Sequence, residues 1–167
     1  MAVCDLGGGS TELAVGRPGA APVWCTSLDV GSLRMTERYL HHDPPTRRQI
    51  EKARAAVRGQ VSALAPGPPA PARALATGGT ARALRKLVGE TLGPDQLTAA
   101  VEISTRTSPR KLQRRFGVPR WRARVVPGGA LVLVEIQALL GVPLEVAAGG
   151  LREGAVLRLL EHAALAA

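Results

Sequence analysis

Short apolar runs separated by glycine and proline open the chain. Residues 1–5, 11–16 and 22–29 predict three strands, and the middle one alternates in polarity along Glu12-Leu13-Ala14-Val15. Because the connections between them are short and rich in turn residues, we expect the three strands to form one meander.

Helical periodicity follows. Residues 31–40 predict one helix, and residues 46–64 predict a stronger one, with Thr46 as N-cap and apolar residues spaced by one helical turn. A proline-rich linker at residues 66–71 cannot be helix or central strand. It leads into a fourth strand at residues 72–77.

The second half of the chain alternates in the same way. We expect helices over residues 80–88, over residues 95–115 with a break at Ser108-Pro109, over residues 130–140 and from residue 151 to about 163. Residues 89–94 close the first of these helices, and residues 144–147 predict a fifth strand. The helix at 130–140 has one acidic residue and must be largely buried. This order indicates a single α/β domain over residues 1–167.

Composition supports a globular domain with an anionic partner. The chain is 46% hydrophobic, enough for a core at 167 residues, and its net charge is +9. Basic residues without an acidic one run from Arg106 to Arg124. This run is compatible with a solvated basic face, a track for a long phosphate chain, or a nucleic-acid surface; only Phe116 and Trp121 offer stacking platforms, so nucleic acid is the least favoured. The candidate polyanion track consists of Arg106, Arg110, Lys111, Arg114 and Arg115.

The cysteines and the hydropathy of the chain indicate the compartment in which the protein works. Cys4 and Cys25 both lie in apolar, strand-like runs, so we expect buried free thiols, with a disulfide as the less favoured alternative. The sequence shows no signal peptide and no apolar stretch of membrane-spanning length. We therefore expect a cytoplasmic protein without a membrane partner.

The first candidate site is the segment 5–12, DLGGGSTE. A strand that ends in Asp and runs into three glycines allows a sharp turn whose amides face an anion, here those of Gly7, Gly8, Gly9 and Ser10. Asp5 and Glu12 would add two carboxylates, which suits Mg²⁺ and an attacking water as catalytic groups. The alternatives are a glycine-rich hairpin without a ligand and carboxylates that only cap turns.

A second glycine turn follows the fourth strand at Thr77-Gly78-Gly79-Thr80. In α/β sheets ligands bind beyond the carboxyl ends of strands, where helix N-termini point partial positive charge at anions. Gly78, Gly79 and Thr80 are therefore candidate phosphate-binding residues that face the same ligand as the first turn. The alternative is an ordinary strand-to-helix turn with Thr80 as N-cap.

Five motifs occur in one order along the chain: residues 5–12, residues 28–34 (LDVGSLR), residues 77–80, residues 126–130 (VPGGA) and residues 149–154 (GGLREG). This order resembles the exopolyphosphatase and guanosine pentaphosphate phosphohydrolase (Ppx/GppA) family, and only the second half of its core. The resemblance implies one actin-like (ribonuclease H-like) domain, with a mixed five-stranded sheet and helices on both faces. The family's first domain, with its own phosphate loop and general base, is missing here.

The resemblance also implies a function. We expect the phosphate-binding half of a Mg²⁺-dependent phosphohydrolase that releases terminal phosphate from inorganic polyphosphate or guanosine pentaphosphate, weak or inactive alone. Its partner would be the missing first domain or a second copy of the chain. A non-catalytic polyphosphate- or nucleotide-binding module acting through a partner chain is the alternative. Met1 stands where a strand within a longer protein would begin, which leaves open both a truncation and a stand-alone half.

Overall fold

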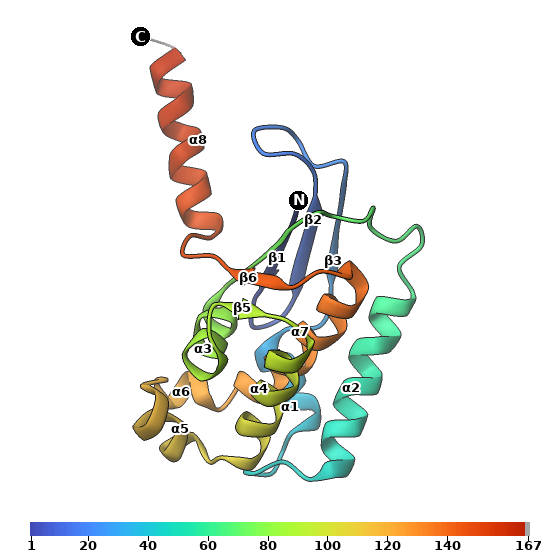
Figure 1. Ribbon diagram of the computed structural model, residues 1–167, viewed down its shortest axis with the longest axis vertical. Coiled ribbons are helices and arrows are strands. Elements are labelled where there is room, and N and C mark those ends of the chain that lie inside the picture. Colours follow the sequence, from blue (N-terminus) through green and yellow to red (C-terminus); the bar gives the residue numbers. More distant parts are fainter. Residues whose placement is uncertain (166–167) are drawn as a thin grey trace.

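The computed structural model describes residues 1–165, with side chains through Leu160. A mixed six-stranded sheet in the order β3-β2-β1-β4-β6-β5 forms one layer (Figure 1). Its strands are β1 (Ala2–Leu6), β2 (Thr11–Val15), β3 (Trp24–Leu28), β4 (Ala74–Thr77), β5 (Thr91–Leu92) and β6 (Leu144–Val146).

Strand pairing follows the predicted meander. β1, β2 and β3 pair antiparallel in sequence order, which confirms that prediction. β4 then pairs parallel to β1, and β6 pairs parallel to β4. The carboxyl ends of β1, β4 and β6 therefore meet at one edge of the sheet.

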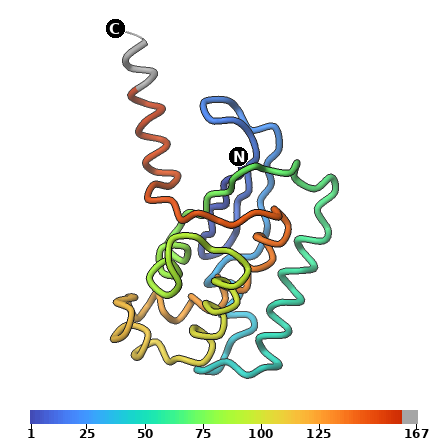
Figure 2. Tube along the Cα trace, in the orientation of Figure 1, coloured from blue at the N-terminus to red at the C-terminus, as the bar shows by residue number. Residues whose placement is uncertain are grey.

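The described chain also contains eight helices. They are α1 (Ser32–Tyr39), α2 (Arg47–Ser62), α3 (Gly79–Val88), α4 (Pro94–Arg106), α5 (Pro109–Phe116), α6 (Arg120–Ala123), α7 (Val126–Leu140) and α8 (Leu151–Leu165). The proline-rich residues 66–71 lie in the loop from α2 back to the start of β4 (Figure 2), where the Ala2 amide donates to Arg73 O at 2.8 Å.

The two faces of the sheet differ in burial. Alternate residues of β1 and β2, including Cys4 and Leu13, are buried in one core cluster with the helices α1 to α5 and α7. The opposite face, which includes Val3 and Ala14, is half-buried or exposed. α8 begins on this second face beside Thr77 and projects away from the sheet, with residues 151–160 exposed (Figure 1).

Helix α7 is the central element of the helical layer. Most of its residues are buried, as its apolar sequence predicts, and it packs against α1, α2, α3 and α4. Its first turn comes unusually close to its neighbours because it carries Gly128 and Gly129. A Cβ on Gly128 would lie 2.7 Å from Ser32 O and 2.7 Å from the Thr36 hydroxyl of α1. A Cβ on Gly129 would overlap the side chain of Thr80 in α3.

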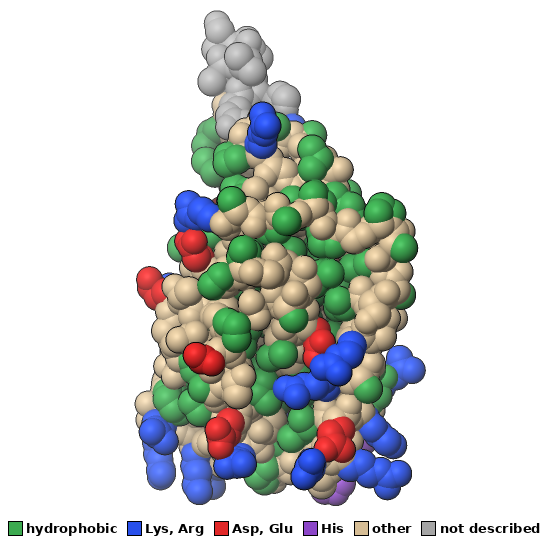
Figure 3. Space-filling model, turned by 45° about the vertical axis from the view of Figure 1, so that its right-hand side comes forward, with side chains coloured by type: hydrophobic (Ala, Val, Ile, Leu, Met, Phe, Trp, Pro, Cys, Tyr) green, Lys and Arg blue, Asp and Glu red, His purple; other side chains and the backbone are tan. Residues whose placement is uncertain are grey.

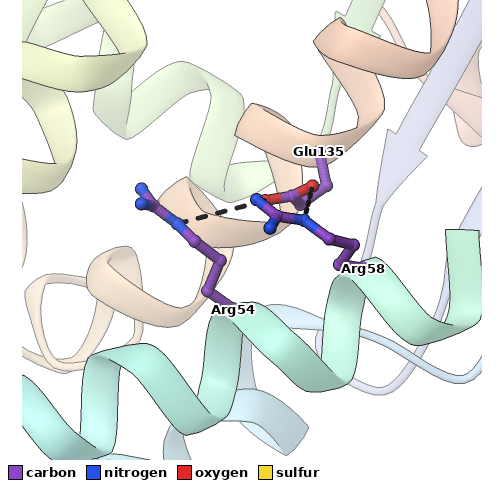
Figure 4. Close-up of polar contacts among 3 residues, drawn as sticks. All are labelled: Arg54, Arg58 and Glu135. Carbon is purple, nitrogen blue, oxygen red and sulfur yellow. Dashed lines mark hydrogen bonds and ion pairs between the residues drawn. The ribbon is translucent and has the colours of Figure 1, made fainter.

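The acidic residue of α7 is held by an ion pair. Glu135 is buried, and Arg58 of α2 binds it through two hydrogen bonds, Nε to Oε2 at 3.2 Å and a terminal nitrogen to Oε1 at 3.1 Å (Figure 4). Arg54 Nε lies 4.0 Å from Oε1. The hydrogen bond to Glu135 raises the pKa of Arg58. The pair joins α2 to α7 and satisfies a carboxylate that would otherwise be costly to bury.

The structure corrects several expectations. The two-residue strand β5 lies within residues 89–94, where only a turn was expected, because Leu92 is buried as β5 pairs antiparallel with β6. Helix α3 is capped by Gly78 rather than Thr80, and α7 begins at Val126. The short helix α6 was not expected at all.

The cysteines correct one further expectation. Both are free, and Cys4 is buried as expected. Cys25 is exposed, because β3 is an edge strand and Cys25 lies on its open face.

No helix within residues 1–165 is both long enough and apolar enough to span a membrane.

Replacing Gly128 with Ala should destabilise the protein by about 1–3 kcal/mol, because the new methyl group meets the backbone of α1 and cannot be relieved by a rotamer change. Gly59→Ala is the matched control: Gly59 is exposed in the last turn of α2 with nothing near its Cβ, so alanine there should stabilise by up to about 0.5–1 kcal/mol. Urea unfolding of the two variants measures both changes. Equal effects would contradict the close approach of α7.

Glu135→Gln should lower the free energy of unfolding by about 1–2 kcal/mol, because it removes charge-assisted hydrogen bonds at a buried position. The control is Glu51→Gln, which removes an exposed pair with Arg47 at 2.8 Å and should change stability by less than about 0.5 kcal/mol. Thermal unfolding monitored by circular dichroism checks the difference, and a Glu135→Gln variant as stable as the control would refute it.

Candidate functional site

Three glycine turns meet at the carboxyl edge of the sheet. Residues 7–10 follow β1, residues 78–79 follow β4, and residues 149–150 follow β6. Their convergence comes from the sheet order, in which β1, β4 and β6 are neighbours. Sequence reasoning expected the first two turns to lie together, and the structure brings them together.

The first turn is built around the start of α1. The Gly7 carbonyl accepts from the Ser32 amide at 3.0 Å, and the Gly8 carbonyl accepts from the amides of Leu33 at 2.9 Å and Arg34 at 3.0 Å. A Cβ on Gly31, the N-cap of α1, would overlap the Gly8 carbonyl. The turn therefore caps α1 with its carbonyls, so that the N-terminus of α1 is occupied and its amides are not available to a ligand.

The amides of the same turn are divided between two uses. The Gly7 amide donates to Ser10 O at 3.0 Å and closes the turn. The prediction that the Gly7 amide faces an anion is therefore wrong, because this amide is already used. Among the described residues no such bond occupies the amides of Gly8, Gly9 and Ser10. These three amides are the donors that the first turn can offer to an anion.

The second turn depends on Gly78. Its φ is +98°, and a Cβ on it would overlap the carbonyl of Leu6 at the end of β1 and lie 3.3 Å from Asp5 Oδ1. Only glycine allows β4 to turn into α3 this close to β1. The first amides of α3, including those of Gly79 and Thr80, have no partner within the helix and form a positive end beside the first turn.

Thr80 can offer a ligand only its backbone amide. Its side chain is fully buried against α7, and its hydroxyl has no hydrogen-bond partner. The prediction that Thr80 binds phosphate therefore reduces to its amide, because the close approach of Gly129 draws the side chain into the core.

Two carboxylates face each other across β1 and β2. Asp5 and Glu12 are register partners on the open face, and Ser27 of β3 donates to Glu12 Oε1 at 3.0 Å. Burial raises the pKa of Asp5, and repulsion from Glu12 raises it further, while Arg82 opposes both effects. Like charges directly opposite each other on a sheet are unfavourable in the absence of a cation or a proton.

These donors fit Mg²⁺. Magnesium is usually held by one or two carboxylates, with waters and substrate phosphates completing its octahedral shell. Asp5 and Glu12 supply such a pair, and among the side chains described, those of residues 1–160, no group of three or more His, Cys, Asp or Glu could hold a metal ion by itself. A cation between the two carboxylates would relieve the repulsion that raises the pKa of Asp5.

The third turn joins the site through Thr77 and Glu153. The Thr77 hydroxyl donates to Gly149 O at 2.6 Å, and the Gly150 amide donates to Glu153 Oε2 at 2.8 Å. Backbone hydrogen bonds lower the pKa of Glu153, and the charges of Arg82 and Arg152 lower it further. Glu153 therefore caps the start of α8 as an anion.

Sequence reasoning missed three arginines at the site. Arg82 lies in the first turn of α3 and acts on the pKa values of Asp5 and Glu153. Arg122 of α6 packs its guanidinium over Gly79, where any Cβ would overlap it. One terminal nitrogen of Arg34 lies 3.6 Å from the Cβ position of Gly9. The signal for Arg82 was its place three residues after Gly79, whereas Arg122 is distant in sequence and carried none.

The predicted polyanion track is divided by the fold. Arg106 ends α4 and pairs with Glu102 at 2.6 Å. Arg110, Lys111, Arg114 and Arg115 lie exposed on α5, one side of which carries the buried Leu112. Basic side chains gather towards the lower end of the molecule in Figure 3. The end of α5 is fastened to α3, because Lys86 Nζ donates to Gly117 O at 2.7 Å.

Comparison with known proteins agrees with this architecture. Exopolyphosphatase 2 of Mycobacterium tuberculosis is 35% identical over 150 residues, covering 80% of this chain and 46% of that protein. Exopolyphosphatase 1 of Mycobacterium bovis is 33% identical over 177 residues, covering 96% of this chain and 51% of that protein. The chain spans about half the length of these curated relatives.

Solved structures show the same fold. The crystal structure of the type II variant of the Aquifex aeolicus Ppx/GppA phosphatase superposes with a TM-score of 0.83 at 25% identity, covering 94% of this chain and 56% of that chain. Another structure of the Aquifex aeolicus family member gives a TM-score of 0.84 at 24% identity, covering 96% and 56%. The expected actin-like α/β fold is confirmed, with a sixth strand added to the expected five.

The family's sequence pattern matches residues 1–163, which include all three glycine turns and the facing carboxylates. The chain therefore belongs to the Ppx/GppA phosphatase family.

Proposed function

We propose that this chain is the phosphate-binding half of a Mg²⁺-dependent phosphohydrolase that releases terminal phosphate from inorganic polyphosphate. The observation that carries the proposal is the convergence of three glycine turns beside Asp5 and Glu12 at one edge of the sheet. The curated relatives are exopolyphosphatases, which supports polyphosphate over guanosine pentaphosphate as the substrate.

Binding in this proposal uses the backbone. The amides of Gly8, Gly9 and Ser10 hold oxygens of the terminal phosphate, and those of Gly79 and Thr80 hold the next unit. Amide donors held rigidly by the cap on α1 and by the Gly78 turn lose little freedom when an anion binds. Arg82 adds positive charge at the junction of the two turns.

Hydrolysis requires charge neutralisation and a positioned water. Asp5 and Glu12 would hold Mg²⁺, which would neutralise phosphate charge and lower the pKa of a bound water. Ser27 orients Glu12 through its hydrogen bond, which would hold this carboxylate in place as a Mg²⁺ ligand beside Asp5. The open face of the sheet lies directly beside this pair, so the chain alone does not exclude bulk water from it.

That open position favours a second candidate, a non-catalytic polyphosphate- or nucleotide-binding module that acts through a partner chain. The chain spans about half of its relatives, and the face beside the carboxylates is uncovered in the described residues. Both candidates use the same turns and differ in whether phosphate is released.

Phosphate release and binding test the proposal together. With Mg²⁺ present and the chain assembled with the family's first domain, Asp5→Asn and Glu12→Gln should each reduce phosphate release from polyphosphate by about 100-fold, because each removes a proposed Mg²⁺ ligand. They should also abolish the Mg²⁺ dependence of tripolyphosphate binding measured by calorimetry. Glu51→Gln, an exposed change on α2, is the control. Mg²⁺-dependent binding without phosphate release from the wild type would favour the non-catalytic module, and unchanged behaviour of both variants would reject the assigned roles.

The raised pKa of Asp5 predicts a dependence of stability on pH and Mg²⁺. Because the folded-state pKa is raised, the contribution of Asp5 to stability is fully present below the unfolded pKa of about 3.9 and is lost as pH rises through the higher folded value. At pH 7 without Mg²⁺, Asp5→Asn should therefore raise Tm by about 1–2 °C, and the difference should vanish at low pH.

Magnesium should reverse that order. Mg²⁺ binds only the folded wild type and should raise its Tm, while leaving that of Asp5→Asn nearly unchanged. Asp43→Asn, in the exposed loop before α2, serves as the control for a lost negative charge. Differential scanning calorimetry at two pH values would refute the carboxylate pair if Asp5→Asn were less stable than wild type at pH 7.

A further inference from the structure

The strand β3 ends the sheet on one side, and its outer edge is unpaired. β3 pairs with β2 alone. Its sequence, WCTSL, contains neither a charged residue nor a proline, two of the features that usually keep an edge strand from pairing with another chain. At the other end of the sheet, β5 has two residues, and so short an edge offers little to a further strand. β3 is therefore the edge at which a further strand can add.

The hydrogen bonds of β2 show which of its backbone groups face β3. The Met1 amino group donates to Gly16 O at 2.7 Å, and the Gly16 amide donates to Met1 O at 3.0 Å. The backbone groups of Gly16 therefore point towards the side of β1. Because the backbone groups of successive residues in a strand point to opposite sides, those of Val15, Leu13 and Thr11 point towards β3.

The same alternation leaves free backbone groups on the outer edge of β3. Thr26 is the register partner of Leu13, so its amide and carbonyl bind β2. The amides and carbonyls of Cys25 and Ser27, on either side of Thr26, then point away from the sheet. Among the described residues no backbone hydrogen bond occupies these groups, and both residues are exposed. Their donors and acceptors are thus open to another strand.

We propose that two copies of this chain pair through β3, antiparallel about a two-fold axis at Thr26, and form one continuous sheet. In this register Cys25 lies opposite Ser27 of the second copy, and each such pair exchanges two hydrogen bonds. Trp24 lies opposite Leu28 of the second copy, which is an apolar pair, and Thr26 lies opposite Thr26, a favourable cross-strand pair. The strand is complementary to itself, and the pairing does not depend on the proposed phosphate chemistry.

The charge distribution favours a second copy at this edge despite the net charge of +9. Between residues 18 and 33 the only charged residue is Asp29, which lies 3.5 Å from Arg34. Repulsion between two copies therefore comes from charges away from the edge, and salt screens these charges. A segment of another protein would need its own matching pattern, whereas a second copy supplies the pattern by symmetry.

The pairing leaves the candidate site accessible. A two-fold axis that relates antiparallel strands of one sheet is perpendicular to that sheet, so the open faces of both copies point to the same side and neither is covered. Ser27, whose hydroxyl donates to Glu12 Oε1 at 3.0 Å, lies next to Cys25 of the second copy. The second copy thus borders the carboxylate pair of the first.

Sedimentation of the full chain tests the pairing. The wild type should form a dimer, and Cys25→Lys should weaken dimerisation by about tenfold or more with an unchanged circular dichroism spectrum, because a lysine on an edge strand opposes the addition of another strand. Gln60→Lys is the matched control: it adds the same charge at an exposed position of α2 and should leave dimerisation unchanged. Raising the salt concentration should strengthen the dimer, since salt screens the repulsion between two basic copies.

A disulfide tests the register. In the pairing about Thr26, the Cα atoms of Cys25 and of residue 27 in the second copy are about 5.5 Å apart, a distance that a disulfide spans. Ser27→Cys should therefore cross-link to Cys25 of the second copy under mild oxidation. Mass spectrometry of mixed isotope-labelled and unlabelled copies shows that the bond joins two chains. The wild type should cross-link about tenfold more slowly, because its two Cys25 residues are not opposite each other.

Each of the following results would overturn the inference. A wild type that stays monomeric would show that the edge does not pair. A dimer that persists in Cys25→Lys and is lost in Leu157→Lys would assign the contact to the exposed helix α8. Equal weakening by Gln60→Lys would show that net charge alone controls association. Rapid cross-linking of the wild type through Cys25, with no bond between positions 25 and 27 in the variant, would contradict the two-fold axis at Thr26.

Discussion

The architecture depends on backbone contact at the start of α7. Gly128 brings this helix against the backbone of α1, and Gly129 brings it against Thr80 of α3. α3 follows the second glycine turn directly, and the start of α1 is capped by the carbonyls of the first turn. The buried helix α7 therefore fixes the distance between the first two turns from the core side of the sheet. A small volume change in the core at this point would move both turns together.

Local signals were sufficient for most of the fold. Polarity alternation in β2 and the apolar run of α7 indicate their elements directly, and Thr46 is the expected N-cap of α2, where it also forms a capping box with Gln49. The expected alternation of strands and helices is confirmed. The exceptions are elements whose presence or first residue depends on tertiary contacts. β5 is two residues long and exists only because β6 lies beside it. α3 starts at Gly79 because Thr80, a good N-cap by local preference, is drawn into the core.

As for the fold, the parts of the candidate site that lie within one sequence segment were predicted, and the contacts between distant segments were not. Glycine turns and their flanking carboxylates are contiguous in sequence, so Asp5 and Glu12 were found from a single segment. The Gly7 amide was misassigned because its bond to Ser10 O is a detail of turn geometry. Arg122 was missed because its role arises from a contact with Gly79, which is far from it in sequence. Residue types indicate chemistry, whereas only packing shows which cation lies beside which turn.

Charged side chains are paired in the core of the protein, whereas like charges lie close together at the candidate site. Glu135 in the core is satisfied by two arginines, and its ion pair joins helices without facing a ligand. At the carboxyl edge of the sheet, in contrast, Asp5 faces Glu12 and Arg122 lies near Arg82, so like charges remain beside one another. Unbalanced charge at a site held by rigid backbone is typical of surfaces whose counter-charge arrives with the ligand.

The two cysteines differ in reactivity, and only Cys25 lies on the open face of the sheet. Burial raises the pKa of the Cys4 thiol to about 12, and the nearby charges of Asp5 and Glu12 add to the effect, so this thiol is unreactive in the folded protein. Cys25 is exposed on the open face of β3, two residues from Ser27, the partner of Glu12. A maleimide dye would therefore attach at one position, beside the carboxylates. Its reaction rate would report directly on whatever covers that face of the sheet.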